Sequence, residues 1–144
     1  MTMRDLDELF EAAKAARARA YAPYSNFPVG AALRSAGGAI HAGCNVENAA
    51  YPTGSCAEAN AIAAMVIAGD SRIIDIAVIG AGAEPVTPCG ACRQRIHEFA
   101  TAETRIHLSD GRGVRKFYFM ADLLPHAFGP ENLAPDRNAA ENTP

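Results

Sequence analysis

Two short cysteine-bearing segments constrain the fold of this chain more than any other feature of its sequence. Cys56 stands in the first, and Cys89 and Cys92 form a Cys-Gly-Ala-Cys pair in the second. A gap of two residues lets both sulfurs of the pair face one metal ion from the first turn of a helix, and Cys56 supplies a third ligand. The fold must therefore bring two separate segments together at one ion.

The number of protein ligands distinguishes a structural metal site from a catalytic one. Structural zinc normally has four protein ligands, whereas catalytic zinc keeps three and leaves one position for water. Glu58, two residues after Cys56, can take a proton from such a water and deliver it to a substrate nitrogen without binding the metal. This Cys-x-Glu, followed by Pro88 and the Cys-x-x-Cys pair, matches the three-cysteine form of the zinc-deaminase signature. We predict one catalytic Zn²⁺ per subunit, held by Cys56, Cys89 and Cys92.

Three thiolates on Zn²⁺ leave an excess negative charge that weakens the ability of the metal to acidify water. Helix N-termini favour thiolates, so we expect Cys56 and Cys89 to stand at helix starts. Arg93 and Arg95 are close in sequence and could add cationic hydrogen bonds. The fourth cysteine, Cys44, has apolar neighbours in a strand pattern, and we expect it to be a buried structural thiol.

Apolar periodicity and turn residues predict a chain of the α/β class. The expected elements are helices over 4–20, 57–68 and 90–99, and strands over 29–33, 39–46, 73–79, 105–108 and 114–119. Residues 21–28 contain two prolines and are expected to form an ordered loop, and residues 47–55 a turn-rich one. The nearly continuous apolar run over 73–79 suits a strand covered on both faces.

Length and composition limit the domain organisation and the kinds of ligand. The 144 residues fit a single domain over 1–133, and the polar, alanine- and proline-rich residues 134–144 are expected to be a disordered tail. A net charge of −3 provides no basic field for a nucleic-acid polymer, so a small-molecule partner fits better. The acidic N-terminus and the absence of a long apolar run predict a cytoplasmic protein with no membrane partner.

Five motifs in order resemble the small, homotetrameric cytidine deaminases, to which the blasticidin-S deaminases are related. They occupy residues 24–32, 43–51, 56–58, 88–94 and 123–130, and the resemblance extends over about 6–133. The resemblance implies a three-layer α/β/α fold with a five-stranded mixed sheet. It also implies hydrolysis of cytidine or deoxycytidine at C4, which yields the uridine product and ammonia, as in pyrimidine salvage.

The resemblance, carried over position by position, assigns roles in substrate binding. It implies that Phe27 packs against the pyrimidine ring and that Asn45 and Glu47 hydrogen-bond the ribose hydroxyls. The Ala57 amide and the backbone carbonyl of Pro88 are expected to orient the base. An aromatic face is a suitable stacking surface for a flat base, which makes the first of these roles chemically reasonable.

In the family, residues corresponding to Tyr51 and Phe128 reach the site of a neighbouring subunit. The resemblance therefore implies a homotetramer whose active sites are completed by neighbouring subunits. One position departs from the family pattern, because many three-cysteine members carry Arg directly after the catalytic Glu and this chain has Ala59. Asn60 could donate a hydrogen bond to a thiolate in place of that Arg.

Two other functions remain open from the sequence. The first is an aminohydrolase that acts on another aminopyrimidine nucleoside or a blasticidin-like compound, although Asn45 and Glu47 favour a ribose-bearing substrate. The second is a non-catalytic, zinc-stabilised protein that binds nucleosides. Editing of cytosines in polynucleotides is disfavoured by the acidic charge balance.

Overall fold

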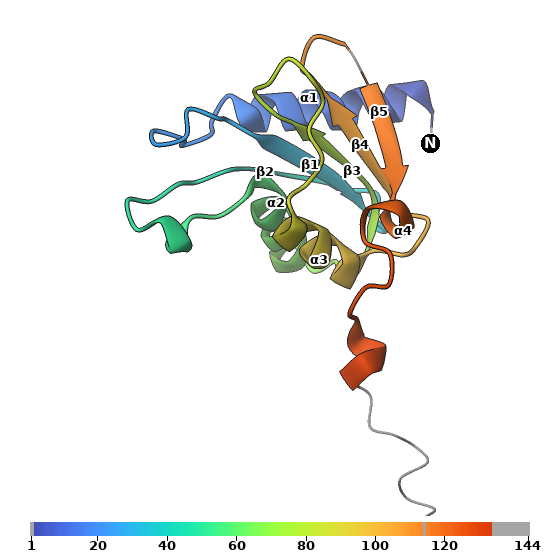
Figure 1. The fold of residues 1–144 in the computed structure, drawn as a ribbon. Helices are drawn as coiled ribbons and strands as arrows, with labels where there is room; N and C mark the ends of the chain where they lie inside the picture. The colour runs from blue at the N-terminus through green and yellow to red at the C-terminus, as the bar shows by residue number, and fades with distance from the viewer. Residues whose placement is uncertain (1, 114, 134–144) are drawn as a thin grey trace, which may run out of the picture.

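The computed structural model describes residues 2–113 and 115–133, which form a five-stranded sheet in the order β2-β1-β3-β4-β5 (Figure 1). The strands are β1 (Gly30–Ser35), β2 (Ile40–Cys44), β3 (Ile73–Ile79), β4 (Arg105–Ser109) and β5 (Arg115–Phe119). Strands β3 and β4 pair in parallel, whereas the other neighbouring pairs are antiparallel. The predicted mixed five-stranded sheet is confirmed.

Helices cover the two faces of the sheet, as Figure 1 shows. They are α1 (Met3–Arg17), α2 (Ala57–Ile67), α3 (Gly90–Phe99) and the short α4 (Met120–Leu123). Side chains of α1 pack on Ala32 and Ala77, while α2 and α3 cover Ala31 and Val78. Successive residues of one strand thus pack into the hydrophobic cores on opposite sides of the sheet, since successive side chains point to opposite faces. The predicted three-layer α/β/α architecture is confirmed.

The first helix is shorter than its sequence pattern predicts. It ends at Arg17 rather than at residue 20, and the chain then turns so that Tyr21 pairs with the segment after β2. The Tyr21 amide donates to the Asn45 carbonyl at 3.0 Å, and the Glu47 amide donates to the Tyr21 carbonyl at 2.8 Å. This tertiary pairing outweighs the helical propensity of residues 18–20.

Three short helical segments were not predicted from the sequence. They are 3₁₀ turns at Tyr51–Thr53 and Pro130–Leu133 and the single turn α4. The predicted tail at 134–144 lies outside the residues that the structure describes, as does Val114, the first residue of the last predicted strand. Among the described helices, none combines the length and the apolar character needed to cross a membrane.

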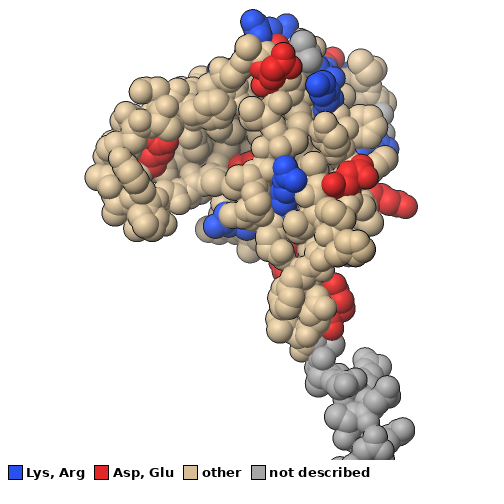
Figure 2. All heavy atoms as spheres, viewed as in Figure 1, with Lys and Arg blue, Asp and Glu red and all other residues tan. Residues whose placement is uncertain are grey.

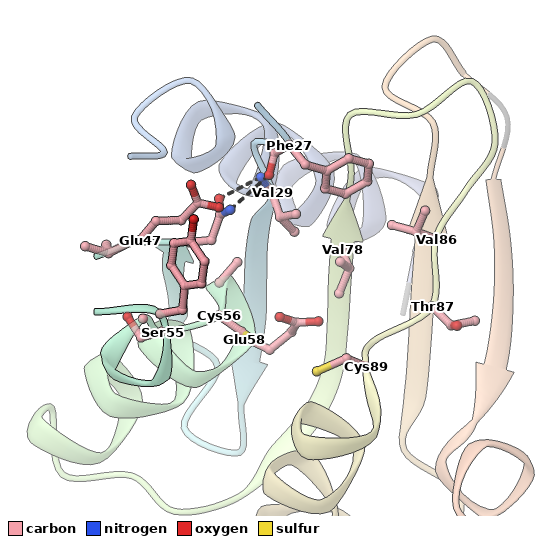
Figure 3. A pocket seen from close by; sticks show the side chains of 15 residues that line it. Phe27, Val29, Glu47, Ser55, Cys56, Glu58, Val78, Val86, Thr87 and Cys89 are labelled. Carbon is pink, nitrogen blue, oxygen red and sulfur yellow. Dashed lines mark hydrogen bonds between the residues drawn. The ribbon is translucent and has the colours of Figure 1, made fainter. Parts of the chain in front are cut away.

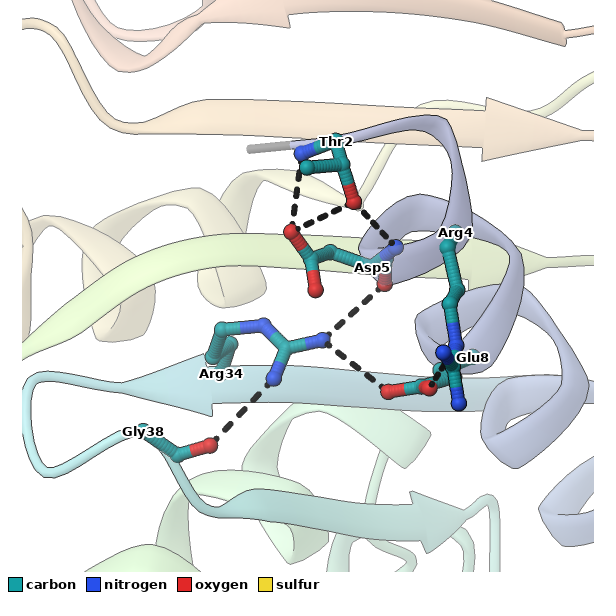
Figure 4. A network of polar contacts seen from close by, with 6 residues as sticks. All are labelled: Thr2, Arg4, Asp5, Glu8, Arg34 and Gly38. Carbon is teal, nitrogen blue, oxygen red and sulfur yellow. Dashed lines mark hydrogen bonds and ion pairs between the residues drawn. The ribbon is translucent and has the colours of Figure 1, made fainter.

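A polar network fastens the start of α1 to the turn between β1 and β2 (Figure 4). Thr2 caps the helix, and it exchanges hydrogen bonds with Asp5 on both its backbone and its hydroxyl, which lowers the pKa of Asp5. Arg34 donates to the Asp5 carbonyl at 3.0 Å and to the Gly38 carbonyl at 3.3 Å. The guanidinium therefore joins the hairpin turn to the first turn of α1.

Strand β2 approaches α2 so closely that only glycine fits at position 43. A Cβ atom at Gly43 would lie 2.4 Å from the Ala61 amide nitrogen and 2.6 Å from the Ala57 carbonyl oxygen. The backbones are thus in direct contact near the N-terminus of α2. This contact fixes the start of α2, where Cys56 and Glu58 stand, against the end of the hairpin.

Candidate active site

The three predicted metal ligands meet where α2 and α3 begin. Cys56 is the N-cap residue of α2, Cys89 is the N-cap residue of α3, and Cys92 lies in the first turn of α3. Their Sγ atoms all lie within 4.8 Å of one another. A tetrahedral Zn²⁺ with Zn–S bonds of about 2.3 Å holds its sulfur ligands about 3.8 Å apart. The cluster therefore has the dimensions and the soft donor atoms that suit a single zinc ion.

A cavity of about 480 Å³ opens directly beside this cluster. Figure 2 shows the surface hollowed next to the lobe that the two loops at 21–28 and 47–54 form. Cys56, Cys89 and Glu58 line the cavity, whereas Cys92 is buried behind it. The other predicted site residues that line it are Phe27, Asn45, Glu47, Tyr51 and Ala57. Phe128 lies elsewhere, so the structure brings together every predicted substrate-binding residue except this one.

Glu58 faces both the sulfur cluster and the cavity (Figure 3). Its side chain stands on the first turn of α2, and the residue is only 5% exposed. The Cys92 thiol donates to Glu58 Oε2 at 3.3 Å. A carboxylate in this place can exchange protons with a group bound at the sulfurs and with a ligand in the cavity.

The environment separates the pKa values of the three thiols. Burial raises the pKa of Cys92, and the nearby Glu58 carboxylate and Cys56 raise it further. Burial also raises the pKa of Cys56. Burial also acts to raise the pKa of Cys89. Hydrogen bonds, chiefly from the amide and the thiol of Cys92, outweigh this effect, so the pKa of Cys89 is lowered. Metal binding to this cluster must therefore release protons.

Asn45 uses its side chain to hold the loop at 21–28. Its Oδ1 accepts from the Val29 amide at 2.8 Å, and its Nδ2 donates to the Phe27 carbonyl at 2.9 Å. Phe27 follows Asn26, which has a φ of 53°, a left-handed conformation that asparagine tolerates better than most residues. The Asn45 amide thus helps to direct the Phe27 ring toward the cavity, as seen in Figure 3.

Glu47 holds the same loop at a second point. Its Oε1 accepts from the Tyr24 amide at 2.9 Å and from the Ser25 amide at 3.1 Å. Hydrogen bonds from Ser25, through its hydroxyl and its amide, and from the Tyr24 amide lower the pKa of Glu47. The carboxylate therefore remains charged at neutral pH and organises the loop that carries Phe27.

Arg93 plays a role that the sequence did not reveal. Its Nε donates to the Pro88 carbonyl at 2.8 Å, one Nη donates to the Leu123 carbonyl at 3.0 Å and the other to Thr87 Oγ1 at 2.9 Å. The guanidinium thus binds α4 and the segment before Cys89 rather than a thiolate. The Pro88 carbonyl, expected to orient the base, faces Arg93 instead, and Thr87 rather than Pro88 lines the cavity.

Other residues near the cluster also differ from what the sequence suggested. Asn60 does not donate to a thiolate, because its Nδ2 donates to the Cys44 carbonyl at 2.7 Å and to Ser55 Oγ at 3.0 Å. Cys44 itself is half-buried at the end of β2 rather than buried. Ala59 and Arg95 line a surface groove between α2 and α3 instead of the cavity.

Three cysteines at two converging helix starts, with a carboxylate on the first turn of one helix, define the class of zinc-dependent deaminases. The family model for the "Cytidine and deoxycytidylate deaminase zinc-binding region" matches residues 3–108. The chain belongs to this family, and the predicted zinc cofactor agrees with both the family and the cysteine cluster.

Individual relatives resemble the chain over nearly its whole length. The cytidine deaminase of Sporosarcina psychrophila is 43% identical over 130 residues, which cover 90% of this chain and 96% of that protein. A crystal structure of cytidine deaminase from Burkholderia pseudomallei is 45% identical with a TM-score of 0.82, and covers 89% of this chain and 100% of that chain. The cytidine deaminase structure from Mycobacterium tuberculosis is 38% identical with a TM-score of 0.75, and covers 87% and 98%. The predicted family is confirmed.

Proposed function

We propose that the chain catalyses the hydrolytic deamination of cytidine and deoxycytidine to uridine and deoxyuridine with release of ammonia, as a step of pyrimidine salvage. The observation that carries this proposal is the position of Glu58, which touches Cys92 and lines a cavity that also contains Phe27, Asn45 and Glu47. The names of the relatives at 35–43% identity support the same reaction.

In the proposed reaction the metal would activate water, and one carboxylate transfers the protons. Cys56, Cys89 and Cys92 would hold Zn²⁺, which when bound would lower the pKa of a coordinated water below that of bulk water, although less than at a site with neutral ligands. Glu58 is the proton carrier: its carboxylate takes one proton from the attacking water and donates it to N3 of the base as the C4–O bond forms. It then takes the proton of the new C4 hydroxyl and donates it to the amine as the C4–N bond breaks and ammonia leaves. The low exposure of Glu58 keeps bulk water from competing for this proton.

The cavity walls supply groups of the kinds that a nucleoside requires. We assign Phe27 to the face of the pyrimidine ring, Asn45 and Glu47 to the ribose hydroxyls, and the Ala57 amide to the base. A carboxylate offers about four acceptor positions, and the two loop amides and the Ser25 hydroxyl use three of those on Glu47. The remaining capacity is available to a sugar hydroxyl.

We also propose that the chain acts as a cytoplasmic homotetramer in which Tyr51 and Phe128 help to complete the sites of neighbouring subunits. Tyr51 is 76% exposed and Phe128 is 56% exposed, and large exposed aromatic side chains suit contact with another chain. Light scattering on the purified protein should give a mass of four times 15.1 kDa. A monomer that is fully active would contradict this assembly.

The reaction is tested by following cytidine and deoxycytidine loss by ultraviolet absorbance, with zinc measured on the same sample. Glu58→Gln should retain zinc and lose about 10²- to 10⁴-fold in turnover, because a general acid–base group is removed. Glu103→Gln, at an exposed position outside the cavity, is the matched control and should be unaffected.

Other outcomes identify the remaining functions. A zinc-loaded sample that converts neither nucleoside but converts blasticidin S or another aminopyrimidine nucleoside points to the alternative aminohydrolase. Binding of nucleosides without turnover, with an affinity that Glu58→Gln leaves unchanged, points to a non-catalytic binding protein. Either result would overturn the proposed reaction while leaving the family and the zinc site in place.

A further inference from the structure

The connection between β3 and α3, residues 80–88, forms one wall of the cavity. Val86 and Thr87 line the cavity from this connection, which leads directly into Cys89. A Cβ atom at Gly80 would lie 2.5 Å from Val86 Cγ2 and 3.3 Å from Phe27 Cζ, so both side chains border the space over this glycine. Figure 3 shows Phe27 and Val86 on the same side of the cavity. Val86 and Phe27 therefore form adjoining parts of the cavity wall.

Side chains, rather than backbone pairing, hold this connection in place. Within residues 2–113 and 115–133, no backbone–backbone hydrogen bond joins residues 81–87 to another segment. Arg93 holds the end next to α3, through Thr87 and Pro88. At the other end, Arg112 Nη2 donates to the Ala83 carbonyl at 2.8 Å.

Arg112 is itself fixed by the turn between β4 and β5. The Asp110 side chain, 2% exposed, accepts from the amides of Arg112 at 2.8 Å and Gly113 at 3.1 Å, and pairs with Arg112 Nε at 3.3 Å. Gly111 and Gly113 have φ values of 77° and 122°, which other residues rarely adopt. The shape of the turn therefore directs the guanidinium toward the neighbouring connection, which lies beside it in Figure 1.

Little packing supports the connection from behind. A second cavity of about 390 Å³ lies between residues 81–83 and the β4–β5 turn, and Arg17 and Arg112 line it. Open space in this place means that few van der Waals contacts restrain residues 81–83. The hydrogen bond from Arg112 to the Ala83 carbonyl then carries much of the restraint.

We propose that Arg112 is a positioning residue for the substrate cavity: it holds residues 81–86 in place and thereby sets where Val86 and Phe27 meet the substrate ring. Its link to substrate binding rests on the proposed function. Arg112 touches neither Glu58 nor the cysteines, so it acts on binding of the ring and leaves proton transfer and zinc unchanged.

The kinetic test compares two arginines of the same hairpin. Arg112→Ala should raise the KM for cytidine about three- to tenfold with kcat changed less than about twofold, as expected for loss of one charge-assisted hydrogen bond that shapes the binding site. Arg112→Lys keeps a donor and should recover part of the affinity. Arg115→Ala is the matched control, because Arg115 pairs with Asp7 at 2.7 Å and does not contact the connection.

A second measurement needs no substrate. The chain contains no tryptophan, and Ala83 is exposed, so Ala83→Trp provides a single reporter on the connection while its backbone carbonyl remains. Tryptophan anisotropy should fall when Arg112→Ala is added and stay constant when Arg115→Ala is added. Melting curves of all variants establish that each one is folded.

The results separate the inference from the proposed function. A wild-type protein that converts neither nucleoside overturns the proposed function, and the anisotropy then still decides whether Arg112 holds the connection. Equal anisotropy and equal KM in the Arg112→Ala and Arg115→Ala variants would overturn the positioning role. So would a joint loss of kcat and zinc in Arg112→Ala, because Arg112 would then act through the metal site.

Discussion

Asn60 connects the end of β2 to the residue that precedes the first metal ligand. Its Nδ2 donates to the Cys44 carbonyl and to Ser55 Oγ, and the group is partly buried. The amide therefore fixes the backbone on both sides of the turn that delivers Cys56 to the cluster. A single polar side chain thus supports the metal site without touching the metal.

Replacement of this amide should weaken both the fold and the metal site. Asn60→Ala leaves two acceptors without a donor, and we expect the free energy of unfolding to fall by about 1–3 kcal/mol. Zinc affinity should fall as well, because Cys56 is held less firmly. Urea unfolding of the metal-free protein and competition with a zinc chelator measure the two effects. Asn132→Ala, which removes a partly buried local hydrogen bond to the Gly129 amide outside the cluster, should leave zinc affinity unchanged.

The sequence predicts the ligands and the proton carrier but not the residues that support them. Cys56, Cys89, Cys92 and Glu58 are recognisable because zinc chemistry requires these residue types at this spacing. The partners of Asn60, Arg93 and Arg112 are mainly backbone carbonyls. Every residue has such a carbonyl, so no pattern of side chains in the sequence records these contacts.

At the scale of elements, the contact between β2 and α2 depends on Gly43. Gly43→Ala would place a methyl group against the backbone of α2, and we expect a loss of about 1–3 kcal/mol of stability together with weaker zinc binding. Gly90→Ala is the matched control, since a Cβ atom there meets nothing within 4 Å. Thermal unfolding with and without zinc compares the two. Equal melting temperatures for both variants would contradict a close contact at Gly43.

Asp70 fastens the connection after α2 to the β1–β2 turn. Its carboxylate accepts from the Gly37 amide at 2.8 Å and from the Ser71 amide at 2.8 Å. The Gly37 amide, the Ser35 hydroxyl and the Ser71 amide lower its pKa from 3.8 to about 2. The folded state therefore favours the ionised carboxylate of Asp70 more strongly than the unfolded chain does.

This shift predicts a defined pH dependence. Because the folded-state pKa is depressed, Asp70 stabilises the fold fully above pH 3.8, and this stabilisation is lost as the pH falls toward about 2. Asp70→Asn should be less stable than the wild type at neutral pH and should lose less stability over that acidic interval. Urea midpoints of the metal-free, reduced protein measure this. Parallel losses in the two proteins would show that Asp70 does not contribute.

The long elements could be predicted because each has a hydrophobic period that its own residues determine. Strand Ile73–Ile79 and helix Gly90–Phe99 have the predicted bounds. The end of α1 and the single-turn helices could not be predicted in this way. The former depends on pairing between Tyr21 and Val46, which are distant in sequence, and the latter are too short to show a period.

At the scale of the molecule, one zinc ion would connect the two helices that cover the same face of the sheet. Ligands that bind only the folded state stabilise it by about 4 kcal/mol at a concentration 1,000 times the Kd. Chelation should therefore lower the melting temperature markedly, and zinc should restore it. Cys92→Ser should remove most of this zinc dependence. Cys44→Ser, outside the cluster, should retain it.

The hydrogen bonds of Asn45 and Glu47 to the loop at 21–28 have a consequence for protein engineering. Each side chain that we assign to the sugar also supports the backbone that carries Phe27. A designer who replaces either residue to admit a modified sugar therefore also disturbs the aromatic platform for the base. Changes in sugar selectivity are better sought at Val46, which lines the same cavity and whose apolar side chain makes no hydrogen bond to the loop.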